Sequence, residues 1–344
     1  ILDPKEIDEW IKEAEEAGEL AIDTETSSLD PHQADLIGVS LSTKIGKACY
    51  IPIGHNSKKS VNKDLVLQKL KPLLEDTSVK KIGQNIKFDF IVLFKHGIII
   101  SSMEDTMLMS YVLDAGKNRH NMDTLSEIHL DHKTIAFKDL VGSGKKEINF
   151  SEVDIEKAKD YAAEDADITF RLYKKFKKSL KDEKMINIYE DFEKPMIKIL
   201  AFMEIEGIKI DNKFLKFLSS KFEKKIEKIQ KEVFKISKKE FNIASPKQLG
   251  EILYNDLKIA DLKKTKKGSF ATSASVLEDL AFKGHKFPQL VLEWRQVSKL
   301  KNTYSDSLPE HINPQTKRVH TSFLLAATTT GRLASSDPNL QNIP

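Results

Sequence analysis

Short apolar runs separated by turn residues dominate the first part of the chain. Residues 19–28, 36–43 and 48–53 are rich in Ile, Val, Leu and Ala. The intervening segments 29–35 and 44–47 carry Pro, Asp and Gly. Apolar runs of this length, bounded by turn residues, are typical of β-strands. The pattern therefore predicts a three-stranded meander.

Helical periodicity follows this meander. Residues 64–76 place apolar side chains at helical spacing, and a short strand over 79–85 precedes a helix that begins near Phe88. The same period of about 3.6 residues then runs through 151–183 and 212–237. Strands mixed with helices in the first half predict an α/β layer.

The second half gives an almost wholly helical signal. Ser151 is the expected cap of the first long helix, and Gly207 interrupts the pattern further on. We therefore predict two domains, an α/β domain over residues 1–187 and a mainly helical one over residues 188–344.

Composition adds four constraints to this picture. The chain has 344 residues, of which 40% are hydrophobic and 31% charged, so it can bury two or three cores. Residues 213–239 carry ten Lys and three Glu, which is typical of a nucleic-acid-binding surface or of a solvated helix face. The single cysteine, Cys49, excludes an internal disulfide and a Cys-based zinc site. The most apolar stretch, 88–100, is too short to span a bilayer, so we expect a cytoplasmic protein without a membrane partner.

Two acids, Asp23 and Glu25, stand at the end of the first predicted strand. Residues i and i+2 project from one face of a strand, so the two carboxylates point the same way. Adjacent carboxylates repel each other, and a bound cation removes that cost. Hard oxygen ligands favour Mg²⁺ or Mn²⁺. A solvated strand end would give the same letters.

Further acids lie in two later segments. Asp89, in GQNIKFDF, stands where a helix starts just after a strand. Tyr161 and Asp165, in YAAEDAD, are four residues apart and share a helix face. Acids from such distant segments could close around two metal ions. Glu164 lies about 100° around the helix from Asp165, and Asp167 is expected to be a solvated charge.

Together the segments IDTETSSLD, IGQNIKFDF and YAAEDADIT resemble the motifs of DEDDy 3′-to-5′ exonucleases, specifically the proofreading domain of family A DNA polymerases. The resemblance implies a ribonuclease H-like mixed sheet with flanking helices. It implies two Mg²⁺ (or Mn²⁺) ions, the first bound by Asp23, Glu25 and Asp165. Asp23 would bridge both ions, and Asp89 would hold the second. Tyr161 would orient the attacking water.

The same resemblance implies contacts with the DNA strand beside the metals. Leu29 would wedge against the terminal base. Gln84 and Asn85 would contact the strand or brace the site. A purely structural role fits these three residues as well.

The helical half resembles the thumb and the opening of the palm of the same polymerase family, most specifically in RVHTSFLLAATTTGRLASSDPNLQNIP. Four lysines on a Gly-bearing loop suit phosphate contacts, although a solvated loop has the same composition: Lys263, Lys264, Lys266 and Lys267. The resemblance implies further DNA contacts in the thumb, at the primer terminus and on the template side: Lys299, Asn302, Thr303, Arg332, Gln341 and Asn342. Ala334 departs from the Ser usual in the family.

We therefore expect a fragment of a family A, bacterial DNA polymerase I-type enzyme. It would bind single-stranded 3′ ends and primer–template duplex, and would hydrolyse DNA 3′ ends to nucleoside 5′-monophosphates. Frayed ends should be preferred, because a mismatch lowers the cost of unpairing. No small-molecule cofactor beyond the metals is expected.

Two other expectations and two alternatives accompany this interpretation. The family places metal-binding acids after LQNIP that this sequence does not contain, so the chain as given should not polymerise DNA, and we expect no 5′ nuclease domain. One alternative is a ribonuclease D-like RNA exonuclease. Another is a non-catalytic DNA-binding scaffold.

Overall fold

The computed structural model describes residues 1–57, 59–259 and 270–344, which pack into two compact units. Unit 1 comprises Ile1–Gly207 together with Thr321–Gln341, and unit 2 comprises Ile208–His320 and Asn342–Pro344. The predicted division into domains at residues 187 and 188 stays a prediction. The four lysines of the Gly-bearing loop, Lys263, Lys264, Lys266 and Lys267, lie outside the described residues.

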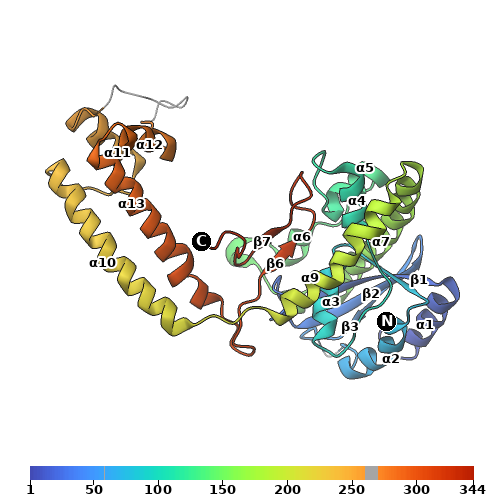
Figure 1. Cartoon of the computed structure of the whole chain (residues 1–344). Helices are drawn as coiled ribbons and strands as arrows, with labels where there is room; N and C mark the ends of the chain where they lie inside the picture. The colour runs from blue at the N-terminus through green and yellow to red at the C-terminus, as the bar shows by residue number, and fades with distance from the viewer. Residues whose placement is uncertain (58, 260–269) are drawn as a thin grey trace. The chain divides into compact units, whose positions relative to one another are not determined.

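Unit 1 is built on a five-stranded mixed sheet (Figure 1). The strands lie in the order β3 (Lys47–Pro52), β2 (Leu36–Lys44), β1 (Glu19–Thr26), β4 (Lys80–Gly83) and β5 (Met103–Asp105). β1, β2 and β3 pair antiparallel, which confirms the predicted meander, whereas β4 and β5 extend the sheet in parallel from β1. The mixed sheet with flanking helices confirms the predicted α/β class.

The sheet of unit 1 is covered by helices. The helices of unit 1 are α1 (Glu6–Ala17), α2 (Lys63–Glu75), α3 (Ile86–Phe94), α4 (Thr106–Asp114), α5 (Met122–Leu130), α6 (Phe137–Val141), α7 (Ile155–Asp182), α8 (Ile186–Ile188) and α9 (Lys194–Glu206), with short helical turns η1 (Gly144–Lys146), η2 (Phe150–Glu152) and η3 (Tyr189–Glu193). The longest of them, α7, packs across β1, β2 and β3 (Figure 1). Its buried residues recur at helical spacing, so its apolar stripe faces the sheet.

The start of α7 differs from the prediction. Asp154 caps the helix, because its side chain accepts a hydrogen bond from the backbone N–H of Glu156. Ser151, the predicted cap, lies in the preceding turn η2. Asp and Ser are comparably good caps, so the sequence did not distinguish the two positions.

A segment far along the chain completes unit 1. The hairpin of β6 (Ser322–Leu324) and β7 (Ala334–Ser336) belongs to this unit, and Leu325 beside it is part of the same hydrophobic core as the strands. Helix α9 contributes Ile197, Leu200 and Ala201 to that core. It ends at Glu206, before Gly207, whose φ of 61° is readily adopted by glycine.

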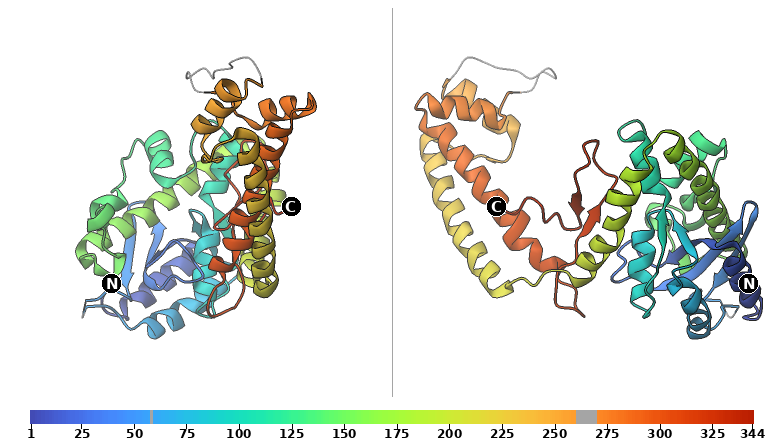
Figure 2. Two further views of the ribbon diagram at one scale, coloured as in Figure 1. Left: turned by 90° about the vertical axis from the view of Figure 1, so that its left-hand side faces the viewer. Right: turned by 45° about the vertical axis from the view of Figure 1, so that its right-hand side comes forward.

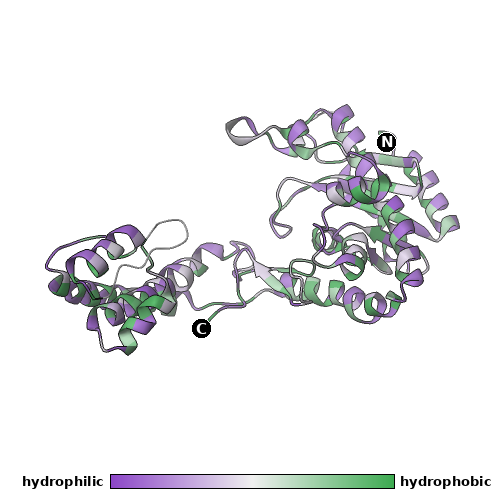
Figure 3. Ribbon diagram, turned by 90° about the horizontal axis from the view of Figure 1, so that it is seen from above, coloured by the Kyte–Doolittle hydropathy of each residue, from purple (hydrophilic) through white to green (hydrophobic). Residues whose placement is uncertain are grey.

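Unit 2 is helical in the part of the chain that is described. Its elements are α10 (Asn212–Ser237), α11 (Pro246–Gly250), η4 (Glu251–Asp256), α12 (Ala274–Phe282), α13 (Lys286–Leu300), η5 (Lys301–Asp306) and η6 (Leu308–His311). The long helices α10 and α13 pack side by side (Figure 2). Hydropathy alternates along them, as expected for amphipathic helices with a separate small core (Figure 3). None of the described helices combines the length and apolar character needed to cross a membrane.

Candidate active site

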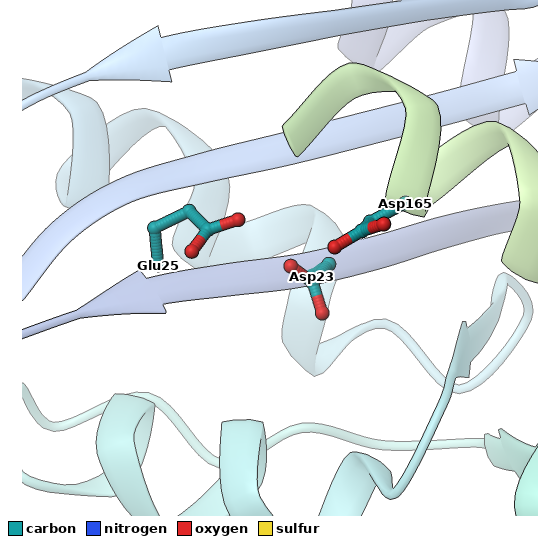
Figure 4. A group of neighbouring side chains, drawn as sticks. All are labelled: Asp23, Glu25 and Asp165. Carbon is teal, nitrogen blue, oxygen red and sulfur yellow. The ribbon is translucent and has the colours of Figure 1, made fainter. Parts of the chain in front are cut away.

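Three carboxylates meet on one face of the sheet in unit 1. Asp23 and Glu25 project from β1, and Asp165 projects toward them from α7 (Figure 4). One carboxylate oxygen from each residue lies within 4.8 Å of the other two. Glu25 and Asp165 are buried and Asp23 is half-buried. The alternation of a strand and the packing of α7 thus bring together acids 140 residues apart.

Asp89 lies beside this cluster and is fixed by β1. Strand β4 pairs only with Glu19–Ala21, so among the described residues no strand lies along the edge of β1 beyond Ala21 on that side. Asp89, from the first turn of α3, fills this place, and its Oδ1 accepts hydrogen bonds from Thr24 N at 2.9 Å and Thr24 Oγ1 at 2.5 Å. Sequence reasoning did not single out Thr24. Its position between Asp23 and Glu25 was the only signal.

The acids strongly perturb one another. Burial raises the pKa of Asp23 to about 6. Burial first, and then the charges of neighbouring acids, raise the pKa values of Glu25, Asp89 and Asp165 well above their usual range. Oε1 of Glu25 is also buried without a hydrogen-bond partner among the described residues. The fold thus holds like charges together at a cost in free energy.

This arrangement fits a divalent cation. The donor set consists of carboxylate oxygens, which are hard ligands preferred by Mg²⁺, Mn²⁺ and Ca²⁺. A cation among them would offset the mutual repulsion and would give the unpartnered Glu25 oxygen a ligand role. The described residues therefore fit the divalent cations that the sequence resemblance implies.

Tyr161 lies one helical turn before Asp165 on α7. Burial raises the pKa of Asp165, and a hydrogen bond from Tyr161 offsets part of that rise. Burial and the neighbouring carboxylates raise the pKa of the Tyr161 phenol. The Tyr161 ring packs against Phe137 and Phe150, with ring centroids 5.9 Å and 6.2 Å away. The aromatic contacts hold the hydroxyl at the edge of the acidic cluster.

The three residues predicted to touch the DNA strand differ in their environments. Leu29 is 93% exposed and follows β1 closely. Asn85 adopts a left-handed conformation at the start of α3, and its N–H lies 3.2 Å from Oδ1 of Asp105. Gln84 donates a hydrogen bond to the His120 carbonyl at 2.7 Å and accepts one from Thr106. The Gln84 side chain therefore braces the loop that precedes α3.

The neighbours of Asp165 on α7 have structural contacts. Glu164 pairs with His132, with Oε1 and Nε2 2.7 Å apart, and accepts a hydrogen bond from the Ile135 N–H at 2.6 Å. The expectation that Asp167 is a solvated charge was wrong. Its carboxylate pairs with Arg171 and accepts the Gly46 N–H, each at 2.6 Å. Asp167 therefore anchors the turn between β2 and β3 to α7, a contact that only the tertiary structure creates.

The remaining predicted DNA contacts are distributed over both units. Lys299, Asn302 and Thr303 are exposed on α13 and η5 of unit 2. Arg332 is exposed in unit 1, in the connection between β6 and β7. Gln341 is exposed and donates a hydrogen bond to the Leu333 carbonyl at 2.7 Å. Asn342 is exposed in unit 2, and its carbonyl accepts a hydrogen bond from Tyr304.

Comparison with known proteins gives two family matches. Residues 1–181 match the model of a 3′-5′ exonuclease, and residues 212–344 match the model of DNA polymerase family A. The match over 212–344 extends beyond the exonuclease domain, and this favours the polymerase interpretation over a ribonuclease D-like enzyme.

Individual relatives agree with these matches. The chain is 46% identical to DNA polymerase I of Rhizobium leguminosarum and 43% identical to DNA polymerase I of Pseudomonas aeruginosa, in each case over 100% of this chain. It spans only 36% and 38% of the length of these relatives.

A solved structure of the POL domain of Pol1 from M. smegmatis, in complex with DNA primer-template and dNTP, matches with a TM-score of 0.83 and 25% identity, over 99% of this chain and 55% of that one. The chain therefore belongs to the 3′-5′ exonuclease family and carries, after this domain, part of a family A DNA polymerase domain.

Proposed function

We propose that this chain is the proofreading part of a DNA polymerase I-type enzyme and that it hydrolyses DNA from the 3′ end to nucleoside 5′-monophosphates. The buried cluster of Asp23, Glu25 and Asp165 carries this proposal, because acids that are held together and have perturbed pKa values gather at functional sites. Asp89, bound to Thr24 beside the cluster, is the fourth acid.

The four acids would hold two divalent ions, Mg²⁺ or Mn²⁺, with Asp23 shared between them. Bound ions supply Lewis-acid activation of water and neutralise the charge that develops on the phosphate and on the leaving 3′ oxygen. Asp23, Glu25, Asp89 and Asp165 bind as carboxylates and therefore release their protons when the site is loaded. Tyr161 would hold the attacking water in line with the phosphorus through its hydroxyl.

The DNA strand would be positioned by groups around these acids. Leu29, exposed beyond β1, is an apolar side chain available to pack against the terminal base. Asn85, the residue just before α3, would contact the strand, and Gln84 supports the same loop. A site among buried acids accepts only an unpaired end, so frayed or mismatched termini should be degraded faster than paired ones.

Duplex binding would use both units. The lysine-rich helix α10 and the exposed Lys299, Asn302 and Thr303 offer sequence-independent contacts to phosphates in unit 2. Arg332, Gln341 and Asn342 would contact the primer–template. The loop lysines Lys263, Lys264, Lys266 and Lys267 would add to the same electrostatic attraction. A cytoplasmic location agrees with this substrate and stays a prediction.

The experiment that tests this function is Mg²⁺-dependent release of mononucleotides from a 3′-labelled single-stranded DNA. Asp23→Ala should lower the rate by at least about 10³-fold, because the shared ligand is removed. Asp182→Ala, at the exposed end of α7, is the matched control and should retain the rate of the unaltered chain.

Two outcomes would contradict the proposal. Equal rates for Asp23→Ala and the unaltered chain would place the hydrolysis elsewhere. DNA binding without any Mg²⁺-dependent release, by the unaltered chain, would favour the alternative of a non-catalytic scaffold.

A further inference from the structure

A tyrosine on β3 lies on the same face of the sheet as the acids. In the register of the meander, Asp23 is opposite Ser40 and Ser40 is opposite Tyr50. Directly opposed residues share a face of the sheet, so the Tyr50 side chain starts on the face that bears Asp23 and Glu25. Tyr50 is only 1% exposed.

The Tyr50 hydroxyl lies against Gly38 of the neighbouring strand β2. A Cβ atom placed on Gly38 would lie 2.1 Å from Oη of Tyr50, so the hydroxyl occupies the place of the missing side chain. Gly38 is in turn the cross-strand partner of Glu25. Cβ positions of such partners are about 5 Å apart. The hydroxyl of Tyr50 is therefore next to the Glu25 side chain and within reach of its carboxylate.

His55 fixes this hydroxyl. Nε2 of His55 lies 2.7 Å from Oη of Tyr50, and both side chains are buried. The hydrogen bond forms with either tautomer, because a phenol can donate or accept. The His55 ring also packs against Phe150, with centroids 5.7 Å apart, and Phe150 packs against Tyr161. Tyr50, His55, Phe150 and Tyr161 thus form a connected series of ring contacts, which ends at Tyr161 beside Asp165.

Among the described residues, one oxygen of the Glu25 carboxylate lacks a hydrogen bond of the kind that holds the Tyr50 hydroxyl. Oε1 is buried without a hydrogen-bond partner in the described parts of the chain. A phenol hydroxyl can donate a hydrogen bond to a carboxylate oxygen, so the neighbouring Tyr50 is suited to partner Oε1 of Glu25. The negative charges of Glu25 and Asp23 add to burial in raising the pKa of Tyr50, which agrees with their closeness.

We propose that Tyr50 and His55 are positioning residues that orient the Glu25 carboxylate for binding a divalent cation, with His55 holding Tyr50 and Tyr50 holding Glu25. The inference rests on the proposed function, since it concerns a residue that would bind the metal there. Partners of this kind orient a metal ligand, and their loss typically weakens metal binding 10–100-fold.

The test is the affinity of the full chain for Mn²⁺, measured by isothermal titration calorimetry without DNA. Tyr50→Phe and His55→Ala should each weaken binding about ten-fold or more. His55→Gln, whose amide can reach Tyr50, should recover most of the affinity. Tyr173→Phe, a buried tyrosine on α7, is the control and should bind as the unaltered chain does.

Thermal unfolding in EDTA separates this role from a loss of folding, because every variant must be folded at the titration temperature. Unchanged affinity in Tyr50→Phe would overturn the proposal, as would an equal loss in Tyr173→Phe. Failure of the proposed function gives a different result, in which the unaltered chain binds Mn²⁺ no better than Asp23→Ala does.

Discussion

At the scale of single residues, the acidic cluster illustrates how a site is held against its own repulsion. Asp23, Glu25 and Asp165 lie on β1 and α7, whose apolar side chains are buried in the hydrophobic core. The packing of α7 on β1 therefore outweighs the repulsion between the acids. Asp89 is held differently, by two hydrogen bonds from Thr24. Each acid therefore has its own structural support, and the cost of the cluster falls on the stability of unit 1 without metal.

We predict that Asp23→Asn stabilises the metal-free protein at neutral pH. Burial raises the pKa of Asp23 from 3.8 to about 6, so the folded state holds this proton more tightly than the unfolded chain does. The free energy of unfolding then falls as the pH rises from about 4 to about 6, and it stays lower above that range. The neutral amide removes this penalty, and we expect roughly 1–3 kcal/mol of added stability at pH 8.

Urea unfolding in EDTA, followed by tryptophan fluorescence, checks this prediction. The two tryptophans lie in different units, Trp10 in α1 and Trp294 in α13, so a Trp294→Phe background reports on unit 1 alone. The gain should vanish at pH 4, where the unaltered acid is protonated. It should reverse in saturating Mn²⁺, which stabilises only the chain that binds it. If Asp23→Asn were less stable than its parent in EDTA at pH 8, the ionised Asp23 carboxylate would not destabilise the metal-free protein, which would contradict the prediction.

At the scale of secondary-structure elements, one carboxylate organises the start of two helices. Asp105 is buried at the end of β5 and accepts backbone hydrogen bonds from Asn85, Ile86, Met107 and Leu108 at 2.9–3.3 Å. Two of these groups begin α3, and the other two begin α4. Helix α3, which carries Asp89, is thus positioned by Asp105, a residue outside the segment IGQNIKFDF.

We predict that Asp105→Ala destabilises unit 1 by about 3–5 kcal/mol, because buried N–H groups of two helices lose their acceptor. Asp154→Ala is the matched control, since this exposed cap of α7 accepts a single N–H from Glu156, at 3.1 Å. It should cost only about 1 kcal/mol. Urea unfolding in the Trp294→Phe background measures both values. Equal costs would show that Asp105 acts as an ordinary cap and not as a link between α3 and α4.

At the scale of the whole molecule, unit 1 joins segments from both predicted domains. Lys87 on α3 and Glu204 on α9 form an ion pair with both side chains buried. Oε1 of Glu204 also accepts the Phe323 N–H of β6, at 2.6 Å. Three segments that lie far apart in the sequence therefore meet at the Glu204 carboxylate. Lys87, which contributes from α3, is two residues before Asp89.

We predict that Lys87→Met destabilises unit 1 by about 3–5 kcal/mol, because the buried Glu204 carboxylate loses its ion pair with Lys87. The double variant Lys87→Met, Glu204→Gln should recover much of this loss, since the amide is neutral and still accepts the Phe323 N–H. Urea unfolding gives the free energies, and hydrogen exchange at residues 321–341 reports whether β6 loosens. A double variant as unstable as Lys87→Met would mean that lost packing, and not the loss of the ion pair, sets the destabilisation.

The sequence by itself determined the meander, the long helices and which acids share a face of their element. Strand alternation fixed that Asp23 and Glu25 point the same way, and helical spacing fixed that Tyr161 and Asp165 share a face, because both are properties of local backbone geometry. The long helices, the meander and the break at Gly207 follow from the same local patterns.

Only the tertiary structure decided which residues surround those acids. Thr24 binds Asp89 because β4 stops short along β1, and Asp167 reaches Gly46 because α7 crosses the sheet. The place of Tyr50 beside Glu25 depends on the pairing of three strands and on a glycine between them. Contacts of this kind join residues far apart in the chain, so no local pattern of letters encodes them.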